Sequence, residues 1–299
     1  MLIKTNATLR KASANKEQSQ QYDVKSGGNK WAFVCSISLN DFGNLRMGSN
    51  GPDEYLRTFS VERKNGKDVG VPNPNPLIQL NTAYSQLNLM QKLAFKPNSK
   101  LELTYAIHHS KTSPFDRYDR LLRTRGGEPR SAQWYYGPQI WTMHHFKTDY
   151  EAQNGLFDNM QFNLAYQHFE ESRIDRDFGS ETINRKTELV DAYTLSLDFS
   201  KKLKEQLILL YGIDGAFNNV NSKGRLAHLG KDTLLQGPSR YPNSTWFSSG
   251  IYATLRNRIS EKTHTEFGLR YTRFLLNSEF DSTFYSLPFS SAKLNQGAL

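Results

Sequence analysis

The sequence contains a single cysteine, Cys35, among its 299 residues. One cysteine excludes an internal disulfide bond and a cysteine-rich metal site. The sequence also lacks a run of the roughly 18 apolar residues that a membrane-spanning helix requires, and its densest apolar segment, residues 207–213, is far shorter. A membrane location would therefore have to be achieved by strands.

Two further kinds of signal are missing. The first residues, 1–6, lack the apolar core of a secretory signal peptide, which typically spans about 7 to 15 residues. This absence favours a truncated chain over a complete precursor of an exported protein, although a cytoplasmic protein would show it too. The sequence also has no glycine-rich phosphate loop, no zinc-ligand spacing and no G-x-S-x-G elbow. We therefore expect neither an enzyme nor a bound cofactor.

The charge balance is basic, with a net charge of +9 and a pI near 9.4. A basic surface raises the question of nucleic acid or acidic ligands. The lysines and arginines are dispersed, however, and no dense basic run is present. One interpretation is that the chain lacks acidic segments which balance the whole protein. The other is that it attracts anionic ligands or lipopolysaccharide.

Hydropathy alternates at period two along most of the chain, which predicts an all-β fold. In residues 31–39 the odd positions are apolar, and in residues 193–199 Tyr193, Leu195, Leu197 and Phe199 alternate with Thr194, Ser196 and Asp198. The mean hydropathy of −0.66 suggests a soluble protein, but transmembrane barrels need only every second strand residue to be apolar. A soluble β-sandwich, with these apolar faces on a dry core, is the alternative.

The predicted connections alternate between long and short, which is typical of an up-and-down barrel in a membrane. Long connections are expected at residues 43–79, 117–138, 170–186 and 219–243, and short turns at 97–100, 154–155, 201–205 and 258–262. About eleven strands result, and the chain is expected to end in a long loop at 278–299. Trp31, Trp246 and Tyr105 are expected in the aromatic girdles at the two membrane interfaces.

One stretch combines arginines and aromatic residues before a Gly-Pro break: Arg117-Tyr118-Asp119-Arg120, followed by Trp134-Tyr135-Tyr136-Gly137-Pro138-Gln139-Ile140-Trp141. It resembles the barrel domain of TonB-dependent outer-membrane receptors, in which an R-Y-D-R segment precedes W-Y-Y-G-P-Q-x-W. Segments 13–17, 40–48 and 165–173, and Arg240-Tyr241-Pro242, resemble the same family in the same order. The resemblance covers nearly the whole chain but only about half of such a receptor.

The resemblance implies that residues 1–299 are the N-terminal part of a transmembrane barrel of about 22 strands in the outer membrane of a Gram-negative cell, without a plug domain. It also implies uptake of a scarce small molecule such as a ferric siderophore, haem or cobalamin. The implied partners are outer-membrane lipid and lipopolysaccharide, and the TonB complex through a plug segment that is absent here; no nucleic acid is expected. The alternatives are a passive barrel or adhesin-like protein without TonB coupling, and a soluble basic β protein that binds nucleic acid or polysaccharide.

The same stretch supplies the candidate ligand-binding residues at the extracellular mouth: Arg117, Tyr118, Arg120, Trp134, Tyr135 and Tyr136. They could bind a bulky anionic or aromatic ligand through charge-assisted hydrogen bonds and stacking. We favour the alternative that they form a rigid shoulder which locks the loop against the barrel wall.

Two other clusters are weaker candidates. The pairs His108-His109 and His144-His145 each offer at most one inward ligand, because neighbouring strand residues point to opposite faces. We also expect the two pairs at different heights, and we predict no metal site. The segment Glu170–Arg176 is interpreted as an ion-pair network at a strand end.

Overall fold

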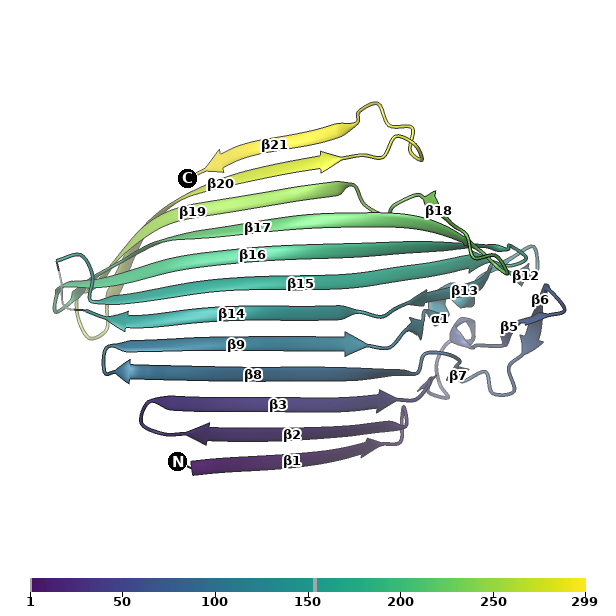
Figure 1. The fold of residues 1–299 in the computed structure, drawn as a ribbon, viewed down its shortest axis with the longest axis horizontal. Helices are drawn as coiled ribbons and strands as arrows, with labels where there is room; N and C mark the ends of the chain where they lie inside the picture. Colours follow the sequence, from purple (N-terminus) through teal and green to yellow (C-terminus); the bar gives the residue numbers. More distant parts are fainter. Residues whose placement is uncertain (1, 153–154) are drawn as a thin grey trace.

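The computed structural model describes residues 2–152 and 155–299, and these form one large antiparallel sheet with three small two-stranded sheets beside it. Along the main sheet the strands follow one another in chain order (Figure 1). They are β1 (Leu2–Ala12), β2 (Glu17–Gly27), β3 (Trp31–Phe42), β8 (Tyr84–Asn98), β9 (Leu101–Thr112), β14 (Ile140–Glu151), β15 (Asn159–Asp177), β16 (Thr182–Lys204), β17 (Leu207–His228), β19 (Asn243–Arg258), β20 (His264–Glu279) and β21 (Ser291–Ala298). This order is the up-and-down topology that the alternation predicted. The sheet is open, with β1 and β21 at its two edges.

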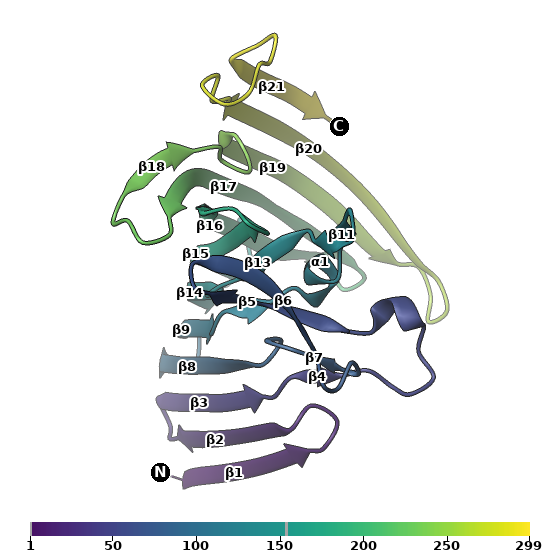
Figure 2. The same cartoon turned by 90° about the vertical axis from the view of Figure 1, so that its right-hand side faces the viewer.

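The two ends of the sheet differ in their connections. At one end, here called the turn end, strands are joined by short segments such as 99–100 and 205–206. At the other, the loop end, the segment between β3 and β8 carries β4 (Leu45–Arg46), η1 (Asp53–Tyr55), β5 (Phe59–Lys64), β6 (Lys67–Pro72) and β7 (Ile78–Gln79). Figure 2 looks onto the loop end and shows these small elements gathered there, with the four-residue β18 (Leu234–Gly237) paired to β17.

Three predicted connections were wrong. Residues 170–186 are not a long loop, because β15 and β16 continue through them and only 178–181 join the two strands. Likewise β17 extends to His228, and β21 occupies part of the predicted terminal loop. The long and short connections therefore do not alternate strictly. The charged composition of these segments misled the prediction, since a strand that projects into water carries polar residues on both faces. The predicted turn at Asn154-Gly155 lies partly outside the described residues.

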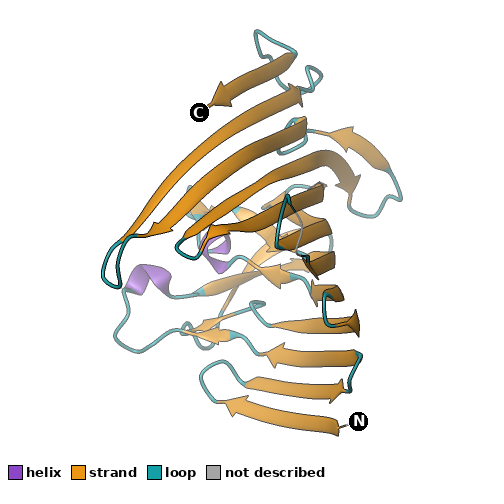
Figure 3. Ribbon diagram, turned by 90° about the vertical axis from the view of Figure 1, so that its left-hand side faces the viewer, coloured by secondary structure: helices purple, strands orange, loops and turns teal. Residues whose placement is uncertain are grey.

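One face of the sheet is apolar and open to the surroundings. The paired residues Phe162, Leu197, Ile213 and Ile251 lie side by side across β15, β16, β17 and β19, and Leu164 pairs with Leu195 on the same face. Leu195 is 39% exposed and Ile251 is 59% exposed, so no second layer covers them. We call this surface the apolar face. In the described part of the chain no sheet faces this one (Figure 3), which excludes the β-sandwich alternative, in which the same side chains would be enclosed.

Two rows of aromatic side chains cross the apolar face. One row runs through Tyr105, His144, Tyr166, Tyr193 and Phe217, with neighbouring ring centroids 5.0–6.3 Å apart. Nearer the turn end, Phe199 stacks on Tyr211 at 5.0 Å and contacts Phe157 in a tilted arrangement at 5.2 Å, and Trp31 stacks on Phe95 at 4.1 Å. On β16 the rows are six residues apart, about 20 Å along the strand. Trp246 was assigned wrongly, since it belongs to the opposite face of β19.

The opposite face, called the polar face, is connected by hydrogen bonds between strands. The Tyr252 hydroxyl donates to Asp198 at 2.5 Å, and Arg270 pairs with Asp214 at 2.7 Å. Gln161 donates to Asp149 at 2.9 Å. Such contacts satisfy charged groups that would be costly on the apolar face. No helix within the described ranges has the length and apolarity needed to cross a membrane.

Candidate functional site

The arginine and aromatic stretch lies in the connection between β9 and β14, at the loop end. This connection contains β10 (Phe115–Asp116), α1 (Tyr118–Leu121), β11 (Thr124–Arg125), β12 (Glu128–Pro129) and β13 (Ser131–Tyr136). β13 pairs with β15 over Ser131–Tyr136, and β10 pairs with β13. The connection is therefore fixed to the sheet by backbone hydrogen bonds, and the predicted loop is largely ordered structure.

Trp134 is the centre of this site. It is only 9% exposed, and three guanidinium groups lie over its ring: Arg117 at 5.2 Å, Arg120 at 5.7 Å and Arg173 at 5.6 Å from the centroid. Tyr136 contacts the same ring edge-on at 5.1 Å. These distances lie within the range of cation–π attraction. Sequence reasoning grouped Arg117, Arg120, Trp134 and Tyr136 correctly, but it missed Arg173, which comes from β15.

Arg117 is engaged within the chain. Its Nε and Nη2 donate to the two carboxylate oxygens of Asp119 at 2.8 and 2.7 Å, and its Nη1 donates to the Tyr136 hydroxyl at 3.1 Å. These hydrogen bonds raise the pKa of Arg117 and hold the pKa of Asp119 below its ordinary value. Because its charge is already balanced by Asp119, Arg117 is suited to fixing the loop.

The remaining predicted residues do not join this cluster. Tyr135 lies between Trp134 and Tyr136 on β13, so alternation directs its side chain to the other face of that strand. Tyr118 is half-buried at the start of α1. Ligand binding by the six residues stays a prediction.

Gly137 marks the point where this connection rejoins the sheet. A Cβ atom at this position would lie 2.5 Å from Cα of Pro114, so a backbone atom blocks any side chain. We expect Gly137→Ala to destabilise the loop by about 1–3 kcal/mol, the usual cost of overpacking. Amide hydrogen exchange in residues 113–139 should become faster. In the control Gly215→Ala, the new Cβ would meet its nearest atom, the Ser248 carbonyl oxygen, at 3.7 Å. Equal exchange in both variants would contradict the prediction.

The stability of the contact between two loop-end connections, the one from β3 to β8 and the one from β9 to β14, should depend on pH because of Asp116. Its backbone N–H donates to the Asn81 carbonyl at 2.9 Å. Burial raises the pKa of Asp116 to about 6, against the opposing effects of Asn81 and Arg57. A raised pKa means that the folded contact favours the protonated carboxyl.

The stability that Asp116 contributes is therefore fully present below its unfolded pKa of about 3.9, and it is lost as the pH rises through about 6. Hydrogen exchange in residues 43–83 should be slower at pH 5 than at pH 7.5, after correction for the intrinsic rate. Asp116→Asn should remove this difference. An undiminished difference in the variant would exclude Asp116 as its source.

A small cavity lies beside Trp134, and its lining includes Arg120 and Arg173 of the cluster around that ring. The cavity has a volume of about 240 Å³ and is lined by Arg120, Arg123, Arg130, Arg173 and Lys186, among others. Sequence reasoning included only Arg120 and Trp134 from this lining. The arginines at 120, 123, 125 and 130 were a visible signal, but nothing in the sequence shows that residues 173 and 186 lie beside them.

The histidine pairs form hydrogen bonds with neighbouring strands. Nδ1 of His144 lies 2.7 Å from the Tyr105 hydroxyl, and Nδ1 of His109 lies 2.9 Å from the Thr142 hydroxyl. β9 and β14 pair His108 with Met143 and Ile107 with His144, so the two histidine pairs are offset by two residues along the strands, in agreement with the expected difference in height. Within 2–152 and 155–299, no group of three or more potential ligands is arranged to hold a metal ion.

The Glu170–Arg176 segment takes part in ion pairs, as its sequence indicated. Arg240 lies 3.1 Å from Glu171, and Arg173 lies 3.8 Å from Asp175. Arg176 reaches Asp68 of β6 at 2.6 Å. The pairs with Arg240 and Asp68 connect β15 to residues far away in the sequence, which is a structural role.

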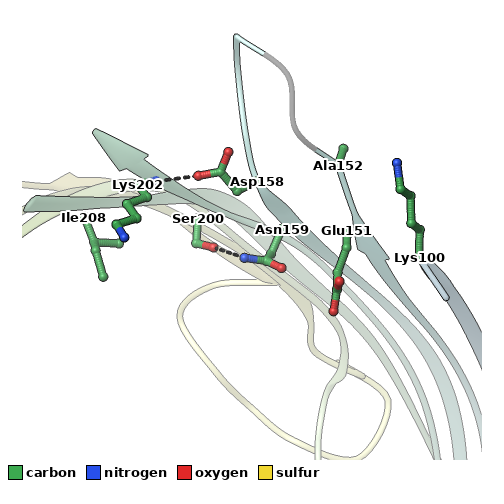
Figure 4. Close-up of a pocket in the computed structure, with 8 residues that line it drawn as sticks. All are labelled: Lys100, Glu151, Ala152, Asp158, Asn159, Ser200, Lys202 and Ile208. Atoms are coloured by element: carbon green, nitrogen blue, oxygen red, sulfur yellow. Dashed lines mark hydrogen bonds between the residues drawn. The ribbon is translucent and has the colours of Figure 1, made fainter. Parts of the chain in front are cut away.

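A larger cavity, about 670 Å³, lies at the turn end (Figure 4). Among its lining residues, Asp158 accepts a hydrogen bond from the Lys202 backbone N–H at 2.7 Å and pairs with the nearby Lys201 at 2.7 Å. Asn159 donates to Ser200 at 3.1 Å. These contacts join neighbouring strands near a turn, and we do not assign a ligand to this cavity.

An up-and-down antiparallel sheet with one exposed apolar face and one hydrogen-bonded polar face defines the class: the wall of a large β-barrel, of which the chain forms about half. No protein-family model matches the sequence, and no curated protein matches it. Solved structures do match. The copper transporter OprC aligns with a TM-score of 0.66 at 11% identity, over 99% of this chain and 41% of that chain.

Two other structures show the same relation. The FrpB iron transporter from Neisseria meningitidis aligns with a TM-score of 0.63 at 12% identity, over 99% of this chain and 42% of that chain. The Serratia marcescens hemophore receptor HasR, in complex with its hemophore HasA and heme, aligns with a TM-score of 0.60 at 12% identity. This alignment covers 99% of this chain and 39% of that chain. The chain thus spans about two fifths of the length of these structures. They confirm the predicted fold class.

Proposed function

We propose that this chain is part of the barrel wall of a TonB-dependent receptor in the outer membrane of a Gram-negative cell. The whole receptor takes up a scarce ligand such as a ferric siderophore, haem or cobalamin. The proposal is supported by the fold shared with transporters and a receptor for copper, iron and a heme-carrying protein. It is also supported by the R-Y-D-R and W-Y-Y-G-P-Q-x-W segments at the loop end.

The observation that carries the proposal is the division of the sheet into an apolar and a polar face. Exposed apolar side chains extend across consecutive strands, from Leu93 on β8 to Leu269 on β20. A soluble protein rarely exposes so large an apolar surface, whereas lipid favours it. The aromatic rows flank this surface as they do in transmembrane barrels. Backbone groups in hydrocarbon must be paired, so the edges β1 and β21 require further strands for closure.

Uptake measurements test the proposal. Cells that produce the protein, and cells that lack it, are supplied in turn with a labelled ferric siderophore, haem and cobalamin, with TonB intact or inactivated. We expect saturable uptake of one of these ligands that requires both the protein and TonB. Uptake that requires the protein but not TonB would indicate a passive barrel instead. A product that is soluble and monodisperse without detergent would refute the membrane assignment.

A further inference from the structure

The cavity beside Trp134 has an excess of positive charge. Five basic side chains line it, from Arg120, Arg123, Arg130, Arg173 and Lys186, against two carboxylates, Asp175 and Asp177. Asp175 already accepts a hydrogen bond from Asn184 at 2.9 Å. The basic groups therefore lack a matching number of anions within the cavity.

Carboxylates just outside the cavity do not supply the balance. Asp119 is held by both ends of the Arg117 guanidinium at 2.7–2.8 Å. Glu171 accepts from Arg240 at 3.1 Å, and Glu188 lies 3.9 Å from the same guanidinium. These acids are engaged by arginines that do not line the cavity.

Two lining arginines also have unused donors. Nε of Arg120 and Nε of Arg173 are buried and have no hydrogen-bond partner among the residues that the structure describes. The carboxylate nearest to Nε of Arg120 is that of Asp119, at 3.9 Å, and the one nearest to Nε of Arg173 is that of Asp175, at 3.8 Å. Both distances are too long for a hydrogen bond. A buried donor without a partner costs roughly 1–3 kcal/mol. Both guanidinium groups are held against the Trp134 ring, so they are oriented before any ligand arrives.

We propose that this cavity binds a multiply charged oxyanion group, either a polycarboxylate or a phosphate. Guanidinium groups bind both through paired N–H donors, and burial strengthens these bonds. The volume of about 240 Å³ suits a small anionic group, or the anionic end of a larger ligand. The cavity lies at the loop end. Together with the proposed uptake function, on which this step rests, it implies that the ligand taken up carries an anionic group. Arg117 is a positioning residue here, because it lies 5.2 Å from the centroid of the Trp134 ring and does not line the cavity.

Direct binding tests the proposal apart from transport. The protein that contains this chain is extracted into detergent and titrated by calorimetry with tricarballylate in one arm and pyrophosphate in the other. We expect saturable binding of at least one anion, weakening as salt is added. Arg173→Gln should weaken it by at least tenfold, the effect of losing one charged hydrogen bond. Arg125→Gln should leave it unchanged, because Arg125 is exposed on the same connection and does not line the cavity.

The two arms also identify the anion. Binding of tricarballylate alone indicates a polycarboxylate ligand, and binding of pyrophosphate alone indicates a phosphate. The absence of binding in both arms at millimolar concentration, with protein whose circular dichroism shows a folded sheet, would overturn the proposal. Equal weakening by Arg173→Gln and Arg125→Gln would overturn it too. If the protein binds the anion but shows no TonB-dependent uptake, the proposed uptake function is refuted and the proposed anion site is supported.

Discussion

Arg176→Met is expected to release the β5–β6 hairpin from the sheet. In the structure, Arg176 of β15 donates two hydrogen bonds to Asp68 of β6, at 2.6 and 2.9 Å, and a third to the Ser180 carbonyl at 2.6 Å. The side chain of Asp68 is fully buried and that of Arg176 is 4% exposed. Removing one partner of a buried pair leaves an uncompensated charge and costs about 3–5 kcal/mol. Hydrogen exchange and proteolysis in residues 59–72 should accelerate strongly.

A control residue touches the same carboxylate. Arg63 lies 3.4 Å from Asp68 but is 30% exposed, so Arg63→Met should cost less than about 1 kcal/mol. Burial raises the pKa of Asp68, but hydrogen bonds from Arg176 and Gly179 outweigh it and the net pKa is lowered. The attachment should therefore persist above the ordinary carboxyl pKa and be lost as the pH falls through the lowered value. Unchanged protection of 59–72 in Arg176→Met would contradict the role assigned to this pair.

Leu197→Lys is the second substitution with a large expected effect. Leu197 lies on β16 between the two aromatic rows, paired with Phe162 on one side and Ile213 on the other. If this face contacts lipid as proposed, a lysine near the middle of the bilayer should cost about 2–4 kcal/mol. The free energy of unfolding in lipid vesicles measures this cost.

Ser196→Lys is the matched control, since the neighbouring residue points to the polar face. Ser196 donates to Asp198 at 3.0 Å and accepts from Asn163 at 3.2 Å, and a lysine there would meet the carboxylate of Asp198. We expect this variant to be tolerated. Equal costs for the two lysines would refute the facing of the strand.

The sequence predicted the faces of the strands well because alternation is local. Tyr193, Leu195 and Leu197 share a face in any strand, whatever the partner strand is. Register and curvature were not needed for that prediction. Two predictions that rested on residue type were wrong. Trp246 was expected in a girdle because it is a tryptophan, although its position in β19 directs it to the face opposite Phe247 and Ile251. Residues 170–186 were expected to be a loop because they are charged.

The candidate site was predicted only in part, since it joins residues that are distant in the sequence. Arg117, Trp134 and Tyr136 could be grouped from one motif. The cavity beside Trp134, in contrast, depends on the pairing of β13 with β15, which brings Arg173 and Asp175 next to residues 131–136. The Asp68–Arg176 pair depends on how a connection folds over the sheet. Neither arrangement leaves a periodic signal in the sequence.

The central claim is that the apolar face contacts lipid and the polar face contacts water. Nitroxide labels at single cysteines in residues 193–199, introduced into a Cys35→Ser background of the membrane-embedded protein, test it most directly. Collision with oxygen reports lipid, and collision with a water-soluble nickel chelate reports water. The account predicts oxygen access at 193, 195, 197 and 199 and nickel access at 194, 196 and 198. Access without this two-residue period, or with its phase reversed, would contradict it.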